Sequence, residues 1–342
     1  MEMVRLGKTE LMVTKTSFGA LPIQRVPMDE AVRLLRKAYD GGINYYDTAN
    51  AYTDSEEKLG RAFKDVRHHI VISTKSQGTD KKTAMEHIEK SLRMLQTDYI
   101  DLFQFHNPAV LPDVNDPDSA FAAALEMKEK GYIRHIGITN HRLNVALEAI
   151  NTGLYETMQF PFSYLSTEKD LEIVNKCKEK DMGFIAMKGL SGGLLNNSAA
   201  CYAYMQQFEN VVPIWGIQKE SELDEWLALS KTDGAMTNEL EAVIEKDRQE
   251  LLGNFCRGCG YCMPCPADIP IYIAARMSFM LQRSPLDRWL NEEWYEKMHR
   301  IENCIGCGHC KGKCPYGLDT PELLKEMLKD FDEKYAAYHG KN

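Results

Sequence analysis

Two runs of cysteines in the last third of the chain limit its fold more than any other feature. Eight of the ten cysteines lie between Cys256 and Cys314. The first run reads Cys-Arg-Gly-Cys-Gly-Tyr-Cys-Met-Pro-Cys-Pro, and the second reads Cys-Ile-Gly-Cys-Gly-His-Cys-Lys-Gly-Lys-Cys-Pro. Three cysteines at two-residue gaps can place their thiolates around one face of a cubic cluster, and the fourth, before a proline, points away. The runs therefore predict a small domain built around metal centres.

We expect two 4Fe-4S clusters, because in two-cluster ferredoxins the fourth cysteine of each run ligates the cluster of the other run. The first set of ligands is Cys256, Cys259, Cys262 and Cys314. The second set is Cys265, Cys304, Cys307 and Cys310. The first run has two residues before its fourth cysteine, where the bacterial pattern has three, so the exchange of Cys265 stays open. Two zinc sites with four thiolates each are the alternative, although such short gaps before a proline suit a cubane better.

The first 230 residues alternate between apolar runs and helical patterns. Eight runs are candidate strands: 15–21, 43–49, 70–75, 100–106, 133–139, 157–162, 183–187 and 211–217. Apolar residues at three- and four-residue steps indicate helices over 29–39, 82–95, 119–130, 142–151, 168–180 and 220–229. Eight such units predict a TIM (β/α)8 barrel. A doubly wound sheet is the alternative, but the first strand is not followed by the glycine-rich phosphate motif of that fold.

Three parts follow from this pattern. Residues 1–235 form the barrel, with an opening hairpin that covers its lower end; residues 236–254 form a connecting helix; and residues 255–342 form a mostly helical ferredoxin-like domain. Further helices are expected over 271–282, 286–301 and 321–338, the last with Thr320 as its N-cap. The remaining long segments, 107–119 and 191–206, are expected to be flexible regions of the barrel rim.

Composition limits the partners of the chain. Its 41 basic and 50 acidic residues give a net charge of −9, which offers no basic surface for nucleic acid or an anionic membrane. No apolar run reaches the ~20 residues that span a bilayer, and the first residues lack the apolar core of a signal peptide. We therefore expect a cytoplasmic protein, in which the cysteines stay reduced.

Four ionisable residues close or follow neighbouring predicted strands. Asp47 ends the second strand, Tyr52 follows five residues later, Lys75 closes the third strand and His106 closes the fourth. Catalytic side chains of TIM barrels lie at these carboxyl ends, so we expect the four to converge, although each alone also has an ordinary structural explanation. A cationic Lys75 oriented by Asp47 would lower the pKa of the Tyr52 phenol from ~10 and make it a general acid. His106 would then orient a substrate carbonyl.

The segments at 47–52, 73–75 and 98–106 resemble the Asp-Tyr-Lys-His segments of the aldo-keto reductases. With the cysteine runs, the whole chain resembles the branch of that superfamily fused to a ferredoxin domain. The resemblance implies a nicotinamide cofactor, NAD(P)(H), and hydride transfer between it and a small carbonyl or alcohol substrate, with Tyr52 as the general acid/base. It also implies that Asn140 and Gln159 hold the nicotinamide carboxamide.

Two positions depart from the family. Where the family stacks an aromatic residue on the nicotinamide, this chain has a methionine followed by Lys188, which becomes a candidate cofactor contact. In the phosphate loop Lys219 is followed by Glu220 and Glu222. Because these acids would repel a 2′-phosphate, the sequence favours NAD over NADP.

The fusion also leaves the function open in one respect. Nicotinamide delivers two electrons as hydride, whereas each cubane accepts one, so a direct relay needs a carrier such as a flavin, for which the sequence has no signature. The clusters could instead be structural or regulatory, or could exchange electrons with a carrier protein. An electron-transfer or redox-sensing protein on a barrel scaffold is therefore the alternative function.

Overall fold

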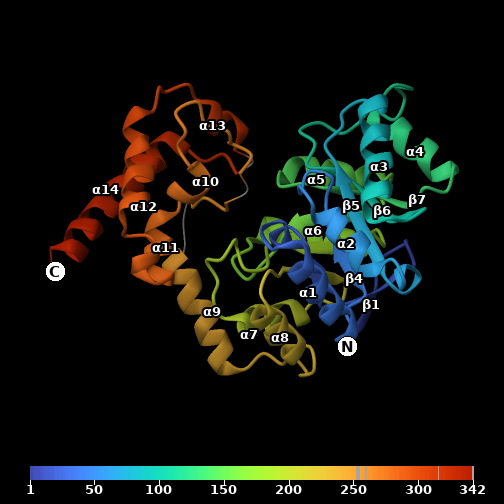
Figure 1. The fold of residues 1–342 in the computed structure, drawn as a ribbon, viewed down its shortest axis with the longest axis horizontal. Helices are drawn as coiled ribbons and strands as arrows, with labels where there is room; N and C mark the ends of the chain where they lie inside the picture. The colour runs from blue at the N-terminus through green and yellow to red at the C-terminus, as the bar shows by residue number, and fades with distance from the viewer. Residues whose placement is uncertain (252–254, 259, 315, 341–342) are drawn as a thin grey trace. The chain divides into compact units, whose positions relative to one another are not determined.

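The computed structural model describes residues 1–251, 255–258, 260–314 and 316–340 (Figure 1). The chain divides into two compact units. The barrel unit comprises Met1–Gly189 and Asn197–Ala242, and the carboxy-terminal unit comprises Leu190–Asn196 and Val243–Asn342. Within the described residues, we find no helix with the length and apolar character that a membrane span requires.

Eight parallel strands close a barrel in the order β10-β3-β4-β5-β6-β7-β8-β9, so the predicted TIM barrel is confirmed (Figure 1). The strands are β3 (Ser17–Gly19), β4 (Tyr45–Asp47), β5 (Val71–Ser76), β6 (Ile100–His106), β7 (Ile133–Thr139), β8 (Thr157–Pro161), β9 (Gly183–Met187) and β10 (Val211–Gly216). Each lies in one of the apolar runs, except that β5 extends one residue beyond its run. The pairing of β10 with β3, which places Trp215 beside Phe18, excludes an open doubly wound sheet.

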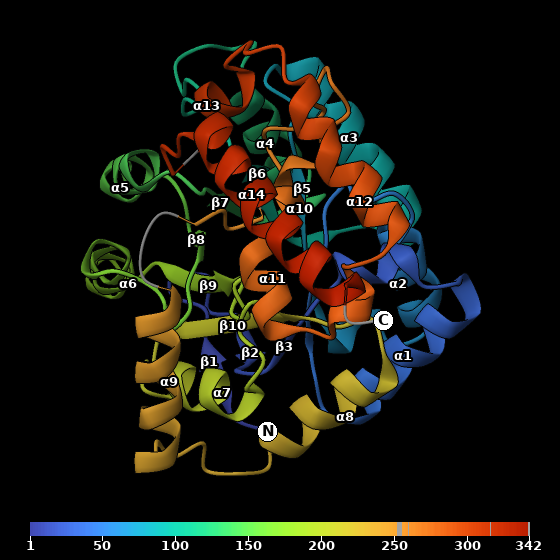
Figure 2. The ribbon, with the colours of Figure 1, turned by 90° about the vertical axis from the view of Figure 1, so that its left-hand side faces the viewer.

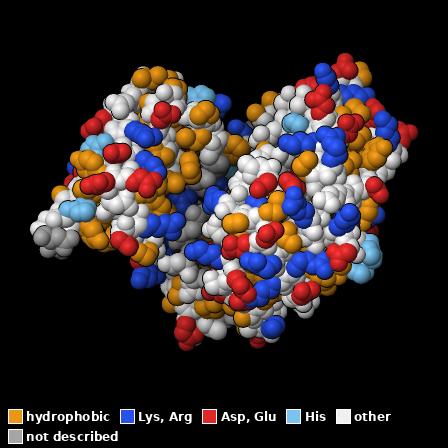
Figure 3. Space-filling model, viewed as in Figure 1, with side chains coloured by type: hydrophobic (Ala, Val, Ile, Leu, Met, Phe, Trp, Pro, Cys, Tyr) orange, Lys and Arg blue, Asp and Glu red, His pale blue; other side chains and the backbone are white. Residues whose placement is uncertain are grey.

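Helices follow the strands around the barrel. They are α1 (Met28–Asp40), α2 (Ser55–Phe63), α3 (Lys81–Leu95), α4 (Ala120–Glu129), α5 (Leu143–Thr152), α6 (Glu168–Glu179), α7 (Ser198–Gln206) and α8 (Glu220–Leu229). The prediction that all of 191–206 is a flexible rim region was wrong for α7. The Asn197 side chain accepts a hydrogen bond from the Ala200 backbone N–H, which begins this helix. On the face of the barrel unit drawn in Figure 3, basic and acidic side chains are interspersed.

The opening hairpin covers the amino-terminal end of the barrel, as predicted. Its strands β1 (Met3–Arg5) and β2 (Met12–Thr14) are antiparallel, and apolar hairpin side chains pack with residues of the barrel strands. Gly7 forms a bridge to Met182 just before β9. A Cβ atom at Gly7 would lie 2.2 Å from the Gly183 backbone nitrogen, so only glycine allows this close approach.

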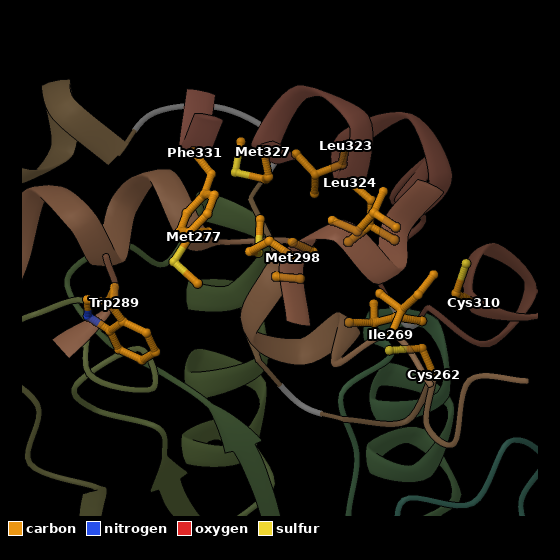
Figure 4. Packing of buried hydrophobic residues seen from close by; sticks show 14 of the residues in the cluster. Cys262, Ile269, Met277, Trp289, Met298, Cys310, Leu323, Leu324, Met327 and Phe331 are labelled. Atoms are coloured by element: carbon orange, nitrogen blue, oxygen red, sulfur yellow. The ribbon is translucent and has the colours of Figure 1, made fainter. Parts of the chain in front are cut away.

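The carboxy-terminal unit is mostly helical. The helix α9 (Asn238–Leu251) begins in the barrel unit and continues into this one. The unit also contains α10 (Ile271–Ala274), α11 (Met277–Arg283), η3 (Leu286–Arg288), α12 (Glu292–His299), η4 (Arg300–Asn303), α13 (His309–Lys313) and α14 (Thr320–His339). The long helix α14 packs against α10, α11, α12 and α13 (Figure 2). Figure 4 shows the apolar core between them, in which Met277 and Met298 lie near Phe331 and Leu324, with Cys262 and Cys310 at its edge.

Two predicted helices of this unit are each broken, so the predictions of continuous helices over 271–282 and 286–301 were wrong. At Arg276 the backbone leaves the helical conformation, with φ −142°, and separates α10 from α11. At Asn291 the side chain accepts a hydrogen bond from the Trp294 N–H and begins α12. The last helix begins at Thr320, with Asp319 in the capping position predicted for Thr320. Periodicity alone did not distinguish these interruptions, because both halves bury apolar residues in the same core.

Candidate functional site

The parallel register of neighbouring strands brings the predicted catalytic residues to one end of the barrel. Asp47 is paired with Ser73 between β4 and β5, and Lys75 with Gln104 between β5 and β6. His106 is the last residue of β6. The carboxyl ends of these strands therefore form one wall of the rim.

Lys75 and Asp47 form a buried ion pair at the centre of this wall. Lys75 is 1% exposed and Asp47 is 3% exposed, and Lys75 Nζ lies 2.6 Å from Asp47 Oδ2. The same ammonium donates to the Thr48 carbonyl oxygen. Burial lowers the pKa of Lys75, and the Asp47 charge opposes this shift. The Asp47 carboxylate thus stabilises the charged form of Lys75 at a position that is shielded from water.

Tyr52 and His106 lie beside this cation. Lys75 Nζ is 5.4 Å from the centroid of the Tyr52 ring, and the Tyr52 and His106 rings meet edge to face at 5.9 Å. Burial, assisted by the Lys75 charge, lowers the pKa of His106 to about 3. The imidazole is therefore neutral at pH 7 and carries one N–H. Its Nδ1 atom is buried and makes no hydrogen bond to the described residues.

A network of hydrogen bonds that the sequence analysis missed fixes the carboxylate of Asp47. The Tyr45 hydroxyl donates to Ser73 Oγ at 2.9 Å, and Ser73 Oγ donates to Asp47 Oδ1 at 2.6 Å. Gln104 Nε2 donates to Gln159 Oε1 at 2.8 Å and approaches Asp47 at 3.4 Å. Gln104 lies two residues before His106 and so faces the same side of β6, a signal available in the sequence as a glutamine inside an apolar strand.

Asn140 and Gln159 are the residues predicted to contact the cofactor. Asn140 directly follows β7, and Gln159 lies in the middle of β8. Asn140 Nδ2 donates to the Pro108 carbonyl oxygen at 2.8 Å, and Gln159 Nε2 approaches Asp47 Oδ2 at 3.4 Å. Each amide nitrogen carries two hydrogens, of which these contacts use one. One donor on each amide can therefore serve a ligand such as a carboxamide.

Lys188 and Lys219, the other predicted cofactor contacts, follow the last two strands. Lys188 comes directly after β9 and has a left-handed backbone with φ 58°. Lys219 is exposed and precedes α8. The Glu222 carboxylate accepts hydrogen bonds from the backbone N–H groups of Gln218 and Lys219, at 2.9 Å and 3.1 Å. An anion at the start of α8 would have to compete with this carboxylate.

The cysteines of the carboxy-terminal unit surround two cavities. One cavity is lined by Cys262, Cys265, Cys304, Cys307 and Cys310. The other is lined by Cys256, Cys262, Cys310 and Cys314. Each cavity therefore receives the fourth cysteine of the opposite run, which is the arrangement that two exchanged ligands require. Cys259 lies outside the described residues.

The loops around these cavities have the backbone that short cysteine spacings need. Gly258, Gly260, Gly306 and Gly308 have positive φ angles between 62° and 80°. The Gly258 N–H donates to Cys256 Sγ at 3.4 Å. In the described part of the chain, no three cysteine, histidine or acidic side chains are arranged to hold a single metal ion. The thiols around each cavity are the ligand type that a four-iron cube takes.

The fold and these two sites define a reductase-type barrel with an iron-sulfur domain, and comparison with known proteins agrees. Residues 15–213, more than half of the chain, match the aldo/keto reductase family, and residues 255–319 match the 4Fe-4S dicluster domain. The chain belongs to the aldo/keto reductase family, an oxidoreductase family, and carries a 4Fe-4S dicluster domain.

Three individual relatives each match more than half of the chain. An uncharacterized oxidoreductase of Bacillus subtilis is 30% identical over 205 residues, which cover 56% of this chain and 65% of that protein. L-galactose dehydrogenase of Arabidopsis thaliana is 30% identical over 213 residues, which cover 57% of this chain and 67% of that protein. The holo form of an aldo-keto reductase from Bacillus halodurans has the same fold, with a TM-score of 0.60, 24% identity, and coverage of 72% of this chain and 96% of that chain.

Proposed function

We propose that the barrel interconverts a small carbonyl compound and an alcohol by hydride transfer with NAD(P)(H), with Tyr52 as the general acid/base. The observation that carries this proposal is the buried Lys75 ammonium, which lies 5.4 Å from the Tyr52 ring centroid and is held by Asp47. A fixed cation stabilises a phenolate more than a phenol, so it assists release of the Tyr52 proton.

In the direction of reduction, a nicotinamide held by Asn140 and Gln159 would supply the hydride that the carbonyl carbon accepts. Tyr52 donates its hydroxyl proton to the carbonyl oxygen, and the hydride and the proton together complete the alcohol. Lys75 stabilises the phenolate that remains, and Asp47 keeps Lys75 charged and in place. His106 donates its N–H to the carbonyl oxygen and orients it, which a neutral imidazole can do without taking the proton from Tyr52.

The proposed cofactor contacts are Asn140 and Gln159 for the carboxamide, and Lys188 and Lys219 along the rim. The remaining amide hydrogens of Asn140 and Gln159 match the carboxamide oxygen. Because Glu222 occupies the backbone donors at the start of α8, we propose that NAD(H) is preferred to NADP(H).

For the carboxy-terminal unit we propose two 4Fe-4S clusters. The first cluster site consists of Cys256, Cys259, Cys262 and Cys314. The second cluster site consists of Cys265, Cys304, Cys307 and Cys310. The cavities that collect these cysteines support the exchange of the fourth ligand between the runs.

Tyr52→Phe tests the catalytic assignment. We expect it to lower kcat by at least about 100-fold, the usual contribution of a general acid, and to leave cofactor affinity and visible absorbance unchanged. Tyr132→Phe is the control, because Tyr132 is 42% exposed and precedes β7 at the other end of the barrel. A Tyr52→Phe protein as active as wild type would contradict the proposal.

Iron analysis and an anaerobic titration test the remaining assignments. We expect about eight iron atoms per chain, as two four-iron clusters require. The purified protein is then titrated with NADH and, separately, NADPH, while the nicotinamide and cluster absorbances are followed together. Bleaching would mean that electrons pass from nicotinamide to the clusters and would direct a search for a flavin. Failure to bind either nucleotide would contradict the proposed chemistry and favour an electron-transfer or redox-sensing role.

A further inference from the structure

Arg276 is a buried cation that the proposed chemistry does not use. It lies between α10 and α11 and is 5% exposed. Its Nη2 atom donates to the Gly192 carbonyl oxygen and approaches Met280 Sδ at 3.3 Å. Among the described residues, no carboxylate pairs with it, and the one charged group that acts on it is Cys256. A buried charge is costly unless an opposite charge compensates it, so the position of Arg276 needs an explanation.

The guanidinium lies against the loop that carries Cys256. A Cβ atom at Gly258 would lie 2.4 Å from Arg276 Nη1, and one at Gly192 would lie 2.7 Å from the same atom. The Gly258 N–H in turn donates to Cys256 Sγ. Because Gly192 and Gly258 have no Cβ atom, the guanidinium fits closely against the backbone at both positions. It therefore lies next to Cys256, a proposed ligand of the first cluster.

The two cluster sites differ in their exposure to water. In the first site Cys262 is buried, and Cys256 and Cys314 are half-buried. In the second site Cys304 and Cys307 are exposed. Reduction adds a negative charge to a cluster that already has four thiolate ligands, and burial in a low dielectric disfavours that charge. Water can stabilise the reduced second cluster. The first depends more on nearby positive charge, for which Arg257 in the lining of its cavity and Arg276 behind the Cys256 loop are the candidates.

We propose that Arg276 is the counter-charge of the first cluster and raises its reduction potential. This inference rests on the proposed cluster assignment. When the first cluster accepts one electron, its added negative charge is stabilised by the guanidinium at short range, where little water screens the interaction. At the second cluster, the exposed Cys304 and Cys307 let water screen an added charge, so removing Arg276 should affect its potential less.

Arg283, whose side chain is 7% exposed, provides a matched control. Arg283 lies on α11 and, like Arg276, approaches a carbonyl oxygen of Leu190–Asn196, that of Leu194 at 3.5 Å. Its charge is already compensated by Asp247 and Glu250, each at 2.7 Å. Replacement of Arg283 therefore removes a comparable loop contact without removing an unpaired positive charge.

The test is an anaerobic redox titration of the full-length holoprotein, with both clusters followed by electron paramagnetic resonance. In Arg276→Gln we expect one of the two one-electron transitions to move to lower potential by at least a tenfold change in equilibrium constant, which is 59 mV. Arg276→Lys, which keeps the charge, should retain most of the wild-type value, and Arg283→Gln should shift neither transition. Cys256→Ser should alter or remove the signal of the cluster that shifted.

Unchanged potentials in Arg276→Gln, an equal shift in Arg283→Gln, or a shift of the second cluster alone would overturn the inference. If Arg276→Gln does not retain both clusters, Gly192→Ala is used, because its Cβ would lie 2.7 Å from Arg276 Nη1 and displace the guanidinium without changing the loop that carries Cys256. A smaller shift in the same direction is then expected, and unchanged potentials would overturn the inference. A wild-type protein without two clusters would instead contradict the proposed function.

Discussion

Asp47→Asn should destabilise the barrel, because it leaves the Lys75 ammonium buried without its counter-charge. Lys75 is 1% exposed, and its ammonium lies 2.6 Å from the carboxylate that the substitution neutralises. Asparagine keeps the size and one oxygen of the aspartate but cannot compensate a charge. The Thr48 carbonyl oxygen remains as an acceptor for Lys75.

Two estimates of the cost agree. Removing one partner of a buried ion pair typically costs about 3–5 kcal/mol. Lys75 could instead lose its proton, and neutralising a lysine of ordinary pKa 10.5 at pH 7.5 costs about 4 kcal/mol, at 1.36 kcal/mol for each pH unit. We therefore expect a loss of about 3–4 kcal/mol, or roughly 10 °C in the unfolding temperature of a domain of this size.

The loss of stability in Asp47→Asn should depend on pH in a direction that can be worked out. If Lys75 is neutral in the folded variant but titrates normally in the unfolded chain, the unfolded chain binds more protons, so stability rises with pH. The deficit of Asp47→Asn relative to wild type should then shrink by about 2 kcal/mol between pH 7.5 and pH 9.

Thermal unfolding should be followed separately in the two units of the holoprotein. Near-ultraviolet circular dichroism reports the stacked pair Trp215 and Trp226 in the barrel, whose ring centroids are 3.9 Å apart, together with the pair Trp289 and Trp294 in the carboxy-terminal unit. Cluster absorbance identifies the transition of the carboxy-terminal unit, and the remaining dichroism change is assigned to the barrel. Lys75→Met and the double variant Asp47→Asn/Lys75→Met complete a double-mutant cycle. The double variant should be more stable than Asp47→Asn alone, because it no longer buries an uncompensated charge. Equal stability of Asp47→Asn and wild type at pH 7.5 would refute the reasoning.

Three further predictions concern other parts of the barrel. Because the pKa of His106 is about 3, the pH profile of kcat/KM for carbonyl reduction should show no change of slope near pH 6.5. A change of slope there that disappears in His106→Asn would contradict a neutral His106. Gly60→Ala should destabilise the barrel by roughly 1–3 kcal/mol in thermal unfolding despite the helix preference of alanine, because its Cβ would lie 2.3 Å from the Met94 carbonyl oxygen; a gain in stability would disprove this close packing. NADH should bind more tightly than NADPH in fluorescence titrations. Glu222→Gln should reduce this difference in affinity, because it removes the negative charge at the start of α8. Equal affinities of the wild-type protein for the two nucleotides would contradict the proposed competition between Glu222 and the 2′-phosphate.

The sequence predicted the parts of the site that depend on local periodicity. The eight apolar runs indicated the strands, and Asp47, Lys75 and His106 could be placed together because parallel strands end on one rim of a barrel. It did not predict the interruption at Arg276 or the grouping of Leu190–Asn196 with the carboxy-terminal unit. Both depend on packing between segments that are distant along the chain.

The sequence by itself determined the barrel class, the residues able to perform acid-base chemistry and the thiols able to hold clusters. Periodicity and spacing record which face of an element is buried and which ligands lie close along the chain. Only the tertiary structure decided which groups that are far apart along the chain come into contact. It placed Gln104 between Gln159 and Asp47, and a buried Arg276 beside the Cys256 loop. Such contacts are set by strand register and helix packing, which bring together residues that no sequence interval relates.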